Sequence, residues 1–315
     1  MSKRIYVTLG RYKNTEIKET SFELIGSVKE SDTGPICCVK DPETSKTRKI
    51  HLDEYEIEES AEAIEIASKS VEELEREIKD KFDTMEDLYN AVFSGAIKSL
   101  MISGSPGTGK SSSIEEILSH QAKLNGYTYS TIKGVATPLY VFEHLRDNCQ
   151  ENHIVIFDDC DNLFYDHSSL NVLKAALDSK KHRIVTWGST RGTESKSFEF
   201  KGSVVFLTNI SFNNITKNEV LKSHLQAMAS RSHYFDVSLN SNIEKFIRIK
   251  QVCKNTDILS SRSIDAEQSK DIIDFIYGNM DKFSELSLRT TSKIVDMFLY
   301  SPDKWRRLIS LTCFK

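Results

Sequence analysis

Apolar and polar positions follow two different rhythms along this chain, and the change of rhythm divides it. In residues 1–58, apolar residues alternate with polar ones in short runs, and Gly34-Pro35 and Asp41-Pro42 interrupt the alternation. Period-two alternation between Gly- and Pro-containing turns is typical of β-strands. The segment therefore predicts a small β-domain, with a barrel as one form that it can take. The predicted strands lie at residues 5–9, 22–25, 36–39 and 48–52.

Residues 59–95 change to a helical rhythm. Apolar side chains such as Ile64, Leu74, Ile78, Leu88 and Val92 recur at roughly helical spacing among acidic residues. We predict an acidic helical linker at 59–95 that leads into the next domain.

Residues 96–239 alternate buried-looking apolar runs with amphipathic segments. This order predicts a mainly parallel sheet with helices on both faces, because successive strand–helix units build that architecture. The predicted strands are 98–103, 127–132, 153–157, 183–187, 203–208 and 233–237, and the predicted helices are 110–124, 138–148, 168–178 and 217–229. Residues 240–315 show no strand pattern and predict a bundle of four helices, namely Ile243–Lys254, Ala266–Met280, Leu288–Tyr300 and Asp303–Thr312.

A candidate phosphate-binding loop joins the first strand of this region to its first helix. The eight residues fit G-x-x-x-x-G-K-[ST] at each fixed position. Its glycines let backbone N–H groups turn toward a polyphosphate at the helix N-terminus, where the helix dipole favours negative charge. A chance Gly-rich turn is the alternative, and the strand–loop–helix context argues against it. The predicted cofactor-binding residues here are Gly104, Ser105, Pro106, Gly107, Thr108, Gly109, Lys110, Ser111 and Ser112, with Lys110 on the β- and γ-phosphates and the Ser111 hydroxyl on Mg²⁺.

A second acidic signature follows the apolar run 153–157. Asp158 and Asp159 stand where the carboxyl end of a buried strand meets the ligand side of an open α/β sheet. Asp158 is predicted to support Mg²⁺, and Asp159 to orient or polarise the attacking water. An acidic turn without chemistry is the alternative, and Asp161 is a weaker competitor for either role.

Three further residues are candidates for contact with a triphosphate. Asn209 ends the apolar run 204–208 and can hydrogen-bond the attacking water or the γ-phosphate, although asparagine also closes turns. Arg231 ends a predicted helix, where a guanidinium can reach the γ-phosphate of a neighbouring subunit or simply oppose the helix dipole. Arg289 begins a C-terminal helix and can touch the nucleotide from there.

The order of these motifs resembles that of an AAA+ ATPase over residues 80–313. The resemblance implies a P-loop NTPase core with a C-terminal helical lid, which binds ATP and Mg²⁺ between the subunits of a homo-oligomer, and the expected oligomer is a hexamer. By resemblance, Lys110 and Ser111 fall in Walker A, Asp158 and Asp159 in Walker B, Asn209 at sensor 1, Arg231 at the arginine finger and Arg289 at sensor 2. The family usually has Glu where this chain has Asp159, which puts the speed of hydrolysis in question. The compact form is similar to ATPases of large tailed phages.

Composition narrows the class of protein. The chain has 315 residues, of which 39% are hydrophobic and 28% charged, as in ordinary globular proteins. No apolar run approaches the roughly 20 residues that cross a bilayer, so no membrane partner is expected. Six scattered cysteines without a C-x-x-C pair predict free thiols and a cytoplasmic location, in the host cytoplasm if a phage encodes the chain.

Charge is uneven although the net charge is only −4. Residues 180–201 carry six basic and two acidic side chains together with Trp187, which suggests a DNA contact through a hairpin. A solvated hairpin with Trp187 packed inward is the alternative. The N-terminal domain, with ten basic against seven acidic residues in 1–51, is a weaker candidate for DNA.

The expected function is an ATPase that remodels or translocates a DNA-linked substrate. Two alternatives stay open: a protein remodeller that threads polypeptide past the segment Lys133–Pro138, and a slow ATP-gated scaffold.

Overall fold

The computed structural model describes residues 3–13, 15–29, 31, 34–40, 47–58, 69–188, 196–210, 219–255 and 259–315. The chain divides into two compact units, Met1–Leu74 and Glu75–Lys315. Of the segments predicted above, residues 59–68 of the linker, with Ile64, and residues 189–195 of the basic segment lie outside the described residues.

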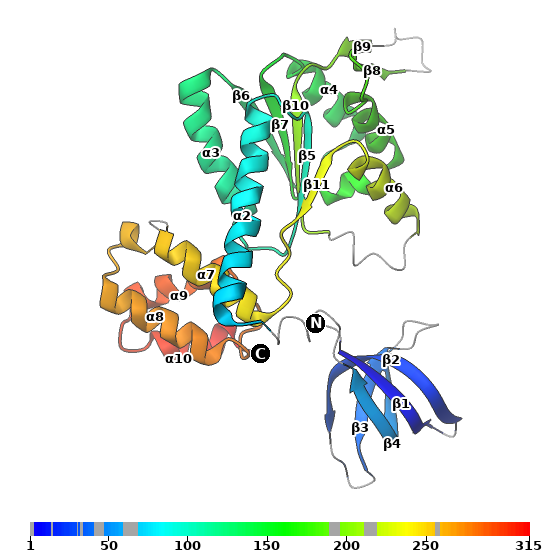
Figure 1. Cartoon of the computed structure of the whole chain (residues 1–315), viewed down its shortest axis with the longest axis vertical. Coiled ribbons are helices and arrows are strands. Elements are labelled where there is room, and N and C mark those ends of the chain that lie inside the picture. The colour runs from blue at the N-terminus through cyan, green and yellow to red at the C-terminus, as the bar shows by residue number, and fades with distance from the viewer. Residues whose placement is uncertain are drawn as a thin grey trace. The chain divides into compact units, whose positions relative to one another are not determined.

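The N-terminal unit contains a closed barrel of four antiparallel strands, labelled β1 to β4 in Figure 1. The strands are Lys3–Tyr12, Thr15–Lys29, Ile36–Lys40 and Thr47–Glu58. Each strand sends alternate side chains inward, as period-two patterning requires. The buried pairs are Ile5 and Val7, Phe22 and Leu24, Cys37 and Val39, and Ile50 and Leu52. The first, second and fourth strands extend well beyond the apolar runs from which they were predicted.

The second unit is built on a parallel sheet of five described strands in the order β11-β5-β10-β7-β6. The strands are β5 (Ser99–Ser103), β6 (Thr128–Lys133), β7 (His153–Asp158), β10 (Ser203–Thr208) and β11 (His233–Asp236). All residues of β5, β7 and β10 are buried, which is typical of central strands covered on both faces.

Helices cover both faces of this sheet (Figure 1). On one face α4 (Pro138–Asp147), α5 (His167–Ala176) and α6 (Glu219–Ala229) pack on Phe157 and Phe206. On the other face lie α2 (Val71–Phe93) and α3 (Lys110–Asn125). A mixed α/β fold with a parallel five-stranded sheet is thus confirmed; the more specific AAA+ assignment stays a prediction.

One predicted strand takes a different place. Residues 184–187 form β8, which pairs antiparallel with β9 (Lys196–Glu199) in a separate two-stranded hairpin instead of joining the main sheet. Only alternate residues of β8 are buried: Val185 is inside, whereas Ile184 is half exposed. A strand with one solvent-exposed face suits a hairpin, since a central parallel strand must be apolar on both faces.

The C-terminal region forms a helical bundle. Its helices are α7 (Asn242–Asn255), α8 (Ala266–Asn279), α9 (Leu288–Tyr300) and α10 (Trp305–Cys313). They enclose one core around the fully buried Trp305. Each helix begins and ends within two residues of its prediction. No helix among the described residues has the length and apolar character needed to cross a membrane.

Candidate functional site

The candidate phosphate loop, residues 104–109, runs from the carboxyl end of β5 to the first turn of α3. Gly109 precedes that turn with a φ of 105°, and no side chain caps the helix there. The first-turn N–H groups of α3 therefore remain available to an anion. Gly107 also has a positive φ, 69°, a conformation that side chains other than Gly, Asn and Asp rarely adopt.

Lys110 is buried and folds back over this loop. Its ammonium donates to the carbonyl oxygens of Gly104 at 2.6 Å and Ser105 at 3.0 Å, and to Asn209 Oδ1 at 3.1 Å. Burial lowers the pKa of Lys110 to about 8, although the nearby Asp159 and Asp158 oppose that shift. A buried ammonium next to a ring of backbone donors is a strong electrostatic partner for phosphate, since little water screens it.

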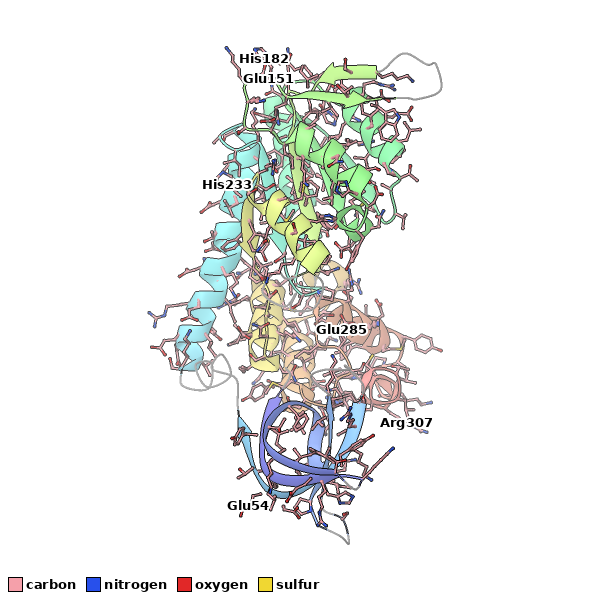
Figure 2. All side chains as sticks on the ribbon, turned by 90° about the vertical axis from the view of Figure 1, so that its right-hand side faces the viewer. Glu54, Glu151, His182, His233, Glu285 and Arg307 are labelled. Atoms are coloured by element: carbon pink, nitrogen blue, oxygen red, sulfur yellow. The ribbon has the colours of Figure 1, made fainter. Side chains whose placement is uncertain are left out.

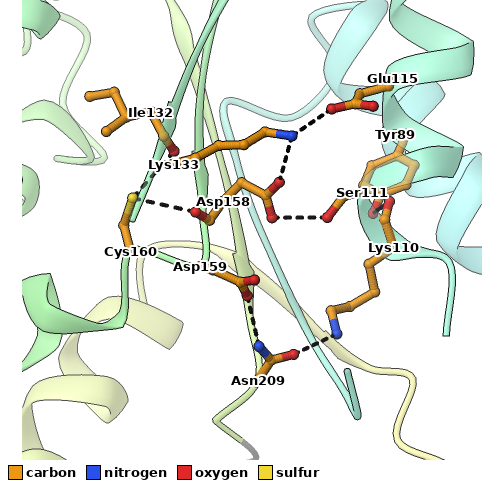
Figure 3. A network of polar contacts seen from close by, with 10 residues as sticks. All are labelled: Tyr89, Lys110, Ser111, Glu115, Ile132, Lys133, Asp158, Asp159, Cys160 and Asn209. Atoms are coloured by element: carbon orange, nitrogen blue, oxygen red, sulfur yellow. Dashed lines mark hydrogen bonds and ion pairs between the residues drawn. The ribbon is translucent and has the colours of Figure 1, made fainter. Parts of the chain in front are cut away.

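A polar network joins Asp158 to Ser111 (Figure 3). The Ser111 hydroxyl donates to Asp158 Oδ1 at 2.9 Å. The other oxygen, Oδ2, lies 3.3 Å from the ammonium of Lys133, which also contacts Glu115 at 2.7 Å. Hydroxyl and carboxylate oxygens are ligands that Mg²⁺ accepts, usually with substrate phosphates completing the shell. Lys133 was not assigned to this site from the sequence, where it only opened the candidate threading segment.

Asp159 and Asn209 form the next link. Asn209 Nδ2 donates to Asp159 Oδ1 at 2.7 Å, while Asn209 Oδ1 accepts from Lys110 (Figure 3). Asp159 has a φ of 53°, in the left-handed region that Asp and Asn tolerate better than longer side chains do. This backbone conformation offers a physical reason for Asp, and not Glu, at this position.

Arg289 reaches the same place from the helical bundle. A cavity of about 300 Å³ is lined by Lys110, Asp159, Asn209 and Arg289. Its remaining lining residues are Pro106, Gly107, Gly109, Ser111, Ser112, Leu288 and Ser292. Residues that are far apart in sequence therefore meet around one small space beside the phosphate loop.

The bundle is bonded to the loop itself. The N–H of Leu288 donates to the carbonyl oxygen of Gly107 at 2.9 Å, and a Cβ on Gly107 would lie 2.7 Å from Cβ of Ser287. The loop and the start of α9 are therefore in close contact, and Gly107 is the residue that allows it.

Replacing Gly107 by alanine should destabilise the fold and weaken nucleotide binding. Gly126→Ala is a matched control, because Gly126 has the same φ of 69° but no atom within 4 Å of the added Cβ. Both substitutions carry the left-handed strain of about 1–2 kcal/mol, and only Gly107→Ala adds the clash. Urea denaturation and nucleotide titration would measure both effects. Equal losses of stability in the two variants would contradict the close packing.

A second cavity, of about 610 Å³, adjoins the first and shares Gly109, Ser112 and Leu288 with it. Within it, Arg248 lies 3.6 Å from the ring centre of Phe82 and donates to the carbonyl of Thr108 at 3.4 Å. Burial lowers the pKa of Arg248 to about 10. Neither Phe82 nor Arg248 was singled out from the sequence, because nothing in their local pattern distinguishes them from core and surface residues.

Helix α2 contributes to the site as well as joining the two units. The hydroxyl of its buried Tyr89 donates to the carbonyl oxygen of Lys110 at 3.3 Å. Near its start, Glu75 contacts Lys250 at 2.6 Å and accepts at its carbonyl from Gln251. The acidic segment thus helps to hold both the phosphate-loop helix and α7.

Other candidates lie elsewhere. Arg231 is at the opposite, amino-terminal edge of the sheet, where it donates to the carbonyl of Ala227 at 2.8 Å. This contact is the helix-capping role that the sequence left open, and within one chain Arg231 does not reach the phosphate loop.

Asp161 accepts from the Thr208 hydroxyl at 2.6 Å, and burial raises its pKa. Trp187 packs against Phe142 with ring centres 5.8 Å apart, so it is not a free stacking platform.

The residues present fit a nucleoside triphosphate with Mg²⁺. The donors suited to phosphate are the loop N–H groups, Lys110 and Arg289, and the oxygens suited to the metal are those of Ser111 and Asp158. Within the described ranges no group of three or more His, Cys, Asp or Glu side chains forms a metal cluster. That finding is compatible with Mg²⁺, which usually takes one or two carboxylates plus phosphate oxygens.

Comparison with known proteins gave one extensive match in sequence. An uncharacterized 36.7 kDa protein from the nrdC-mobD intergenic region of Enterobacteria phage T4 is 30% identical over 318 residues, covering 97% of each chain. No family model matches the sequence. Among solved structures, a replication initiator DnaA bound to AMPPCP and single-stranded DNA aligns with a TM-score of 0.40 and 12% identity. That alignment covers 72% of this chain and 63% of the DnaA chain, and the similarity is too low to support an argument about function.

Proposed function

This chain belongs to the family of the 36.7 kDa protein of Enterobacteria phage T4, and we propose that it is an AAA+ ATPase that binds and hydrolyses ATP with Mg²⁺. One observation carries the proposal: a single cavity brings Lys110, Asp159, Asn209 and Arg289 together at the phosphate loop. These residues come from four separate segments, which a chance Gly-rich turn does not explain. We place its activity in the cytoplasm of the host cell.

Each residue has a role that its contacts support. Lys110 and the loop N–H groups bind the β- and γ-phosphates, and Arg289 adds charge from the lid. Ser111 and Asp158 hold the metal, which neutralises charge on the phosphates when it is bound. Asp159 accepts a hydrogen bond from the attacking water and turns it toward the γ-phosphate. Asn209 fixes Asp159 by the bond at 2.7 Å and, through Lys110, links it to the phosphate loop.

The nucleoside end of ATP fits the adjoining cavity of about 610 Å³. The two cavities share Gly109, Ser112 and Leu288, so one ligand can occupy both. Arg248, whose guanidinium lies over the buried ring of Phe82, offers a planar cation that suits a base.

The position of Arg231 favours assembly of several copies. It lies at the amino-terminal edge of the sheet, and the phosphate loop lies at the carboxyl edge. The five residues of β5 separate these edges by about 13 Å at ~3.3 Å per residue. In this proposal Arg231 therefore acts on ATP held by a neighbouring copy, in a homo-oligomer that we expect to be a hexamer.

The test is ATP hydrolysis measured together with native mass, with Arg231→Ala as the decisive variant. In the assembled state we expect kcat to fall by at least ~100-fold while ATP still binds, because a trans-acting arginine contributes about 10³–10⁵. Arg231→Lys should not restore the rate, since an ammonium lacks the planar fork.

Arg307→Ala, at an exposed arginine of α10, is the matched control and should leave hydrolysis unchanged. If Arg231→Ala hydrolyses ATP normally in the assembled state, the trans role is wrong and the bond to Ala227 is its whole function. If the wild-type chain stays monomeric and does not bind ATP, the proposed function fails altogether.

We expect ATP turnover to act on a DNA-linked substrate, and DNA stimulation of hydrolysis would test this. One observation favours the polypeptide-threading alternative: Val135, in the segment Lys133–Pro138, is 85% exposed. Loss of function on Val135→Ser without loss of DNA binding would support threading. Turnover far below one per second with every partner would instead favour the ATP-gated scaffold.

A further inference from the structure

A third cavity lies away from the phosphate loop. It has a volume of about 1040 Å³ and is lined by residues that precede β5, β7, β10 and β11, together with the segment after α5. All four strands are parallel, so the cavity is at the amino-terminal edge of the sheet. Figure 2 labels Glu151, His182 and His233, three of its lining residues.

The lining of this cavity is rich in basic side chains. Its cations are Lys98, Lys180, Lys181, Arg183, Lys201 and Arg231, against the three acids Glu151, Asp178 and Glu199. They come from segments far apart in the sequence of a chain whose net charge is −4. Convergence of positive charge in a concave surface is therefore a property of the fold, and concavity strengthens the local potential.

Two of these cations have structural roles. Arg183 is buried and donates to the carbonyls of Ala176 at 3.1 Å and Gly202 at 2.7 Å. Arg231 caps α6 and is assigned above to the ATP of a neighbouring copy, so we do not assign it to a ligand of this cavity. The acid Glu199 is also engaged, since it contacts His182 at 2.7 Å and Lys201 at 3.7 Å.

Three exposed lysines remain for a ligand. Among the described residues, no carboxylate forms an ion pair with Lys98, Lys180 or Lys181. Lys98 precedes β5, and the other two follow α5, so the three lysines come from two separate segments of the lining. Several exposed lysines around one large cavity suit the repeated charges of a phosphate chain.

We propose that this cavity binds the phosphodiester backbone of a nucleic acid through Lys98, Lys180 and Lys181. The site is independent of the phosphate loop, which lies about 13 Å away along β5, so binding needs no ATP. It makes backbone contacts that are independent of base sequence, because lysines at phosphates carry no sequence information. The contact uses Lys180 and Lys181 of the basic segment 180–201 that the sequence singled out. It adds Lys98 from a distant segment, and it does not depend on Trp187, which packs against Phe142.

The test compares two triple variants that change the net charge equally. The cavity variant replaces Lys98, Lys180 and Lys181 by alanine, and the control replaces Lys270, Lys293 and Lys304, which are exposed lysines of the helical bundle region. Fluorescence anisotropy with a labelled oligothymidylate, a duplex of the same length and the matching RNA would measure affinity between 50 and 200 mM salt (about the range over which such contacts weaken strongly).

For the strand that binds wild type best, the cavity variant should bind about tenfold or more weakly at low salt. Its plot of log affinity against log salt should be flatter by about 2, because each lost contact to a single strand removes ~0.7. The control variant should match wild type. Lys110→Ala should bind the nucleic acid normally without ATP, which separates this site from the proposed ATPase.

Three results would overturn the proposal. The first is equal binding by the cavity and control variants. The second is absence of binding to single-stranded DNA, duplex and RNA alike at low salt. The third is equally tight binding of polyglutamate of the same charge, which would indicate an acidic protein partner.

Discussion

Replacement of Lys110 by methionine should weaken ATP binding by at least about 100-fold. The ammonium is the one buried cation of the described phosphate loop and contacts two of its carbonyls and Asn209. Methionine keeps most of the length and removes the charge, so at least ~3 kcal/mol of phosphate binding, or about 100-fold in affinity, should be lost. Titration calorimetry measures this loss directly.

Lys270→Met is the control, since Lys270 is an exposed lysine of α8. It should bind ATP as wild type does. Retention of ATP affinity within a few-fold by Lys110→Met would contradict the assignment of the loop.

The Lys110→Met variant should also be more stable than wild type in the absence of nucleotide. Burial lowers the pKa of Lys110 from 10.5 to about 8. Below pH 8 the folded protein therefore keeps a charged ammonium in a buried position, which lowers the free energy of unfolding. Between pH 8 and 10.5 the unfolded chain binds more protons than the folded one, and stability rises with pH through this window. Removal of the ammonium should therefore stabilise the fold at pH 7 by up to ~3 kcal/mol.

Urea denaturation at several pH values measures the difference in the free energy of unfolding between Lys110→Met and wild type. It should be largest at or below pH 8 and should shrink as the pH approaches 10.5. A destabilised Lys110→Met protein at pH 7 would show that the three hydrogen bonds outweigh the cost of burying the charge.

Replacement of Asp159 by asparagine should trap bound ATP. Asparagine tolerates the left-handed φ of 53° and can still accept the bond from Asn209, so the fold and ATP binding should be kept. It cannot carry the negative charge that polarises water, and kcat should fall by about 10²–10⁴-fold. Single-turnover experiments measure the rate of hydrolysis, and a filter-binding assay measures how much ATP stays bound to the protein.

Asp161→Asn distinguishes the two acids. Asp161 accepts from Thr208, and an amide oxygen can accept that bond equally well. Hydrolysis should therefore persist in Asp161→Asn. Loss of hydrolysis in Asp161→Asn, with a normal rate in Asp159→Asn, would show that Asp161, and not Asp159, polarises the attacking water.

Much of the sheet follows from local sequence. Strands β5, β7 and β10 are continuous apolar runs, and such runs have few other stable locations than the centre of a parallel sheet. The carboxyl ends of these strands carry the phosphate loop, Asp158 with Asp159, and Asn209. Their meeting at one edge was predictable because parallel strands align their ends.

The parts that were not predictable depend on contacts between distant segments. Lys133 pairs with Asp158 only because β6 and β7 are neighbours with Lys133 opposite Asp158 in register. Arg248 and Phe82 meet because α7 packs beside α2. Single residues of this kind carry no local signal, since an exposed lysine and a site lysine look alike in sequence.

The strand β8 illustrates a different limit. Its four residues have strand propensity, but propensity does not say which strands become partners. This short strand, in which alternate positions are buried, pairs with β9 and is not part of the main sheet.

The bond between the Leu288 N–H and the Gly107 carbonyl has a mechanical consequence. A triphosphate that draws the amide after Gly107 toward itself must rotate that peptide plane, and the carbonyl rotates with it. The start of α9 must then move with the loop, or the hydrogen bond between Leu288 and Gly107 must break. The C-terminal helices can in this way register whether the loop is loaded through the backbone, in addition to the contact proposed for Arg289.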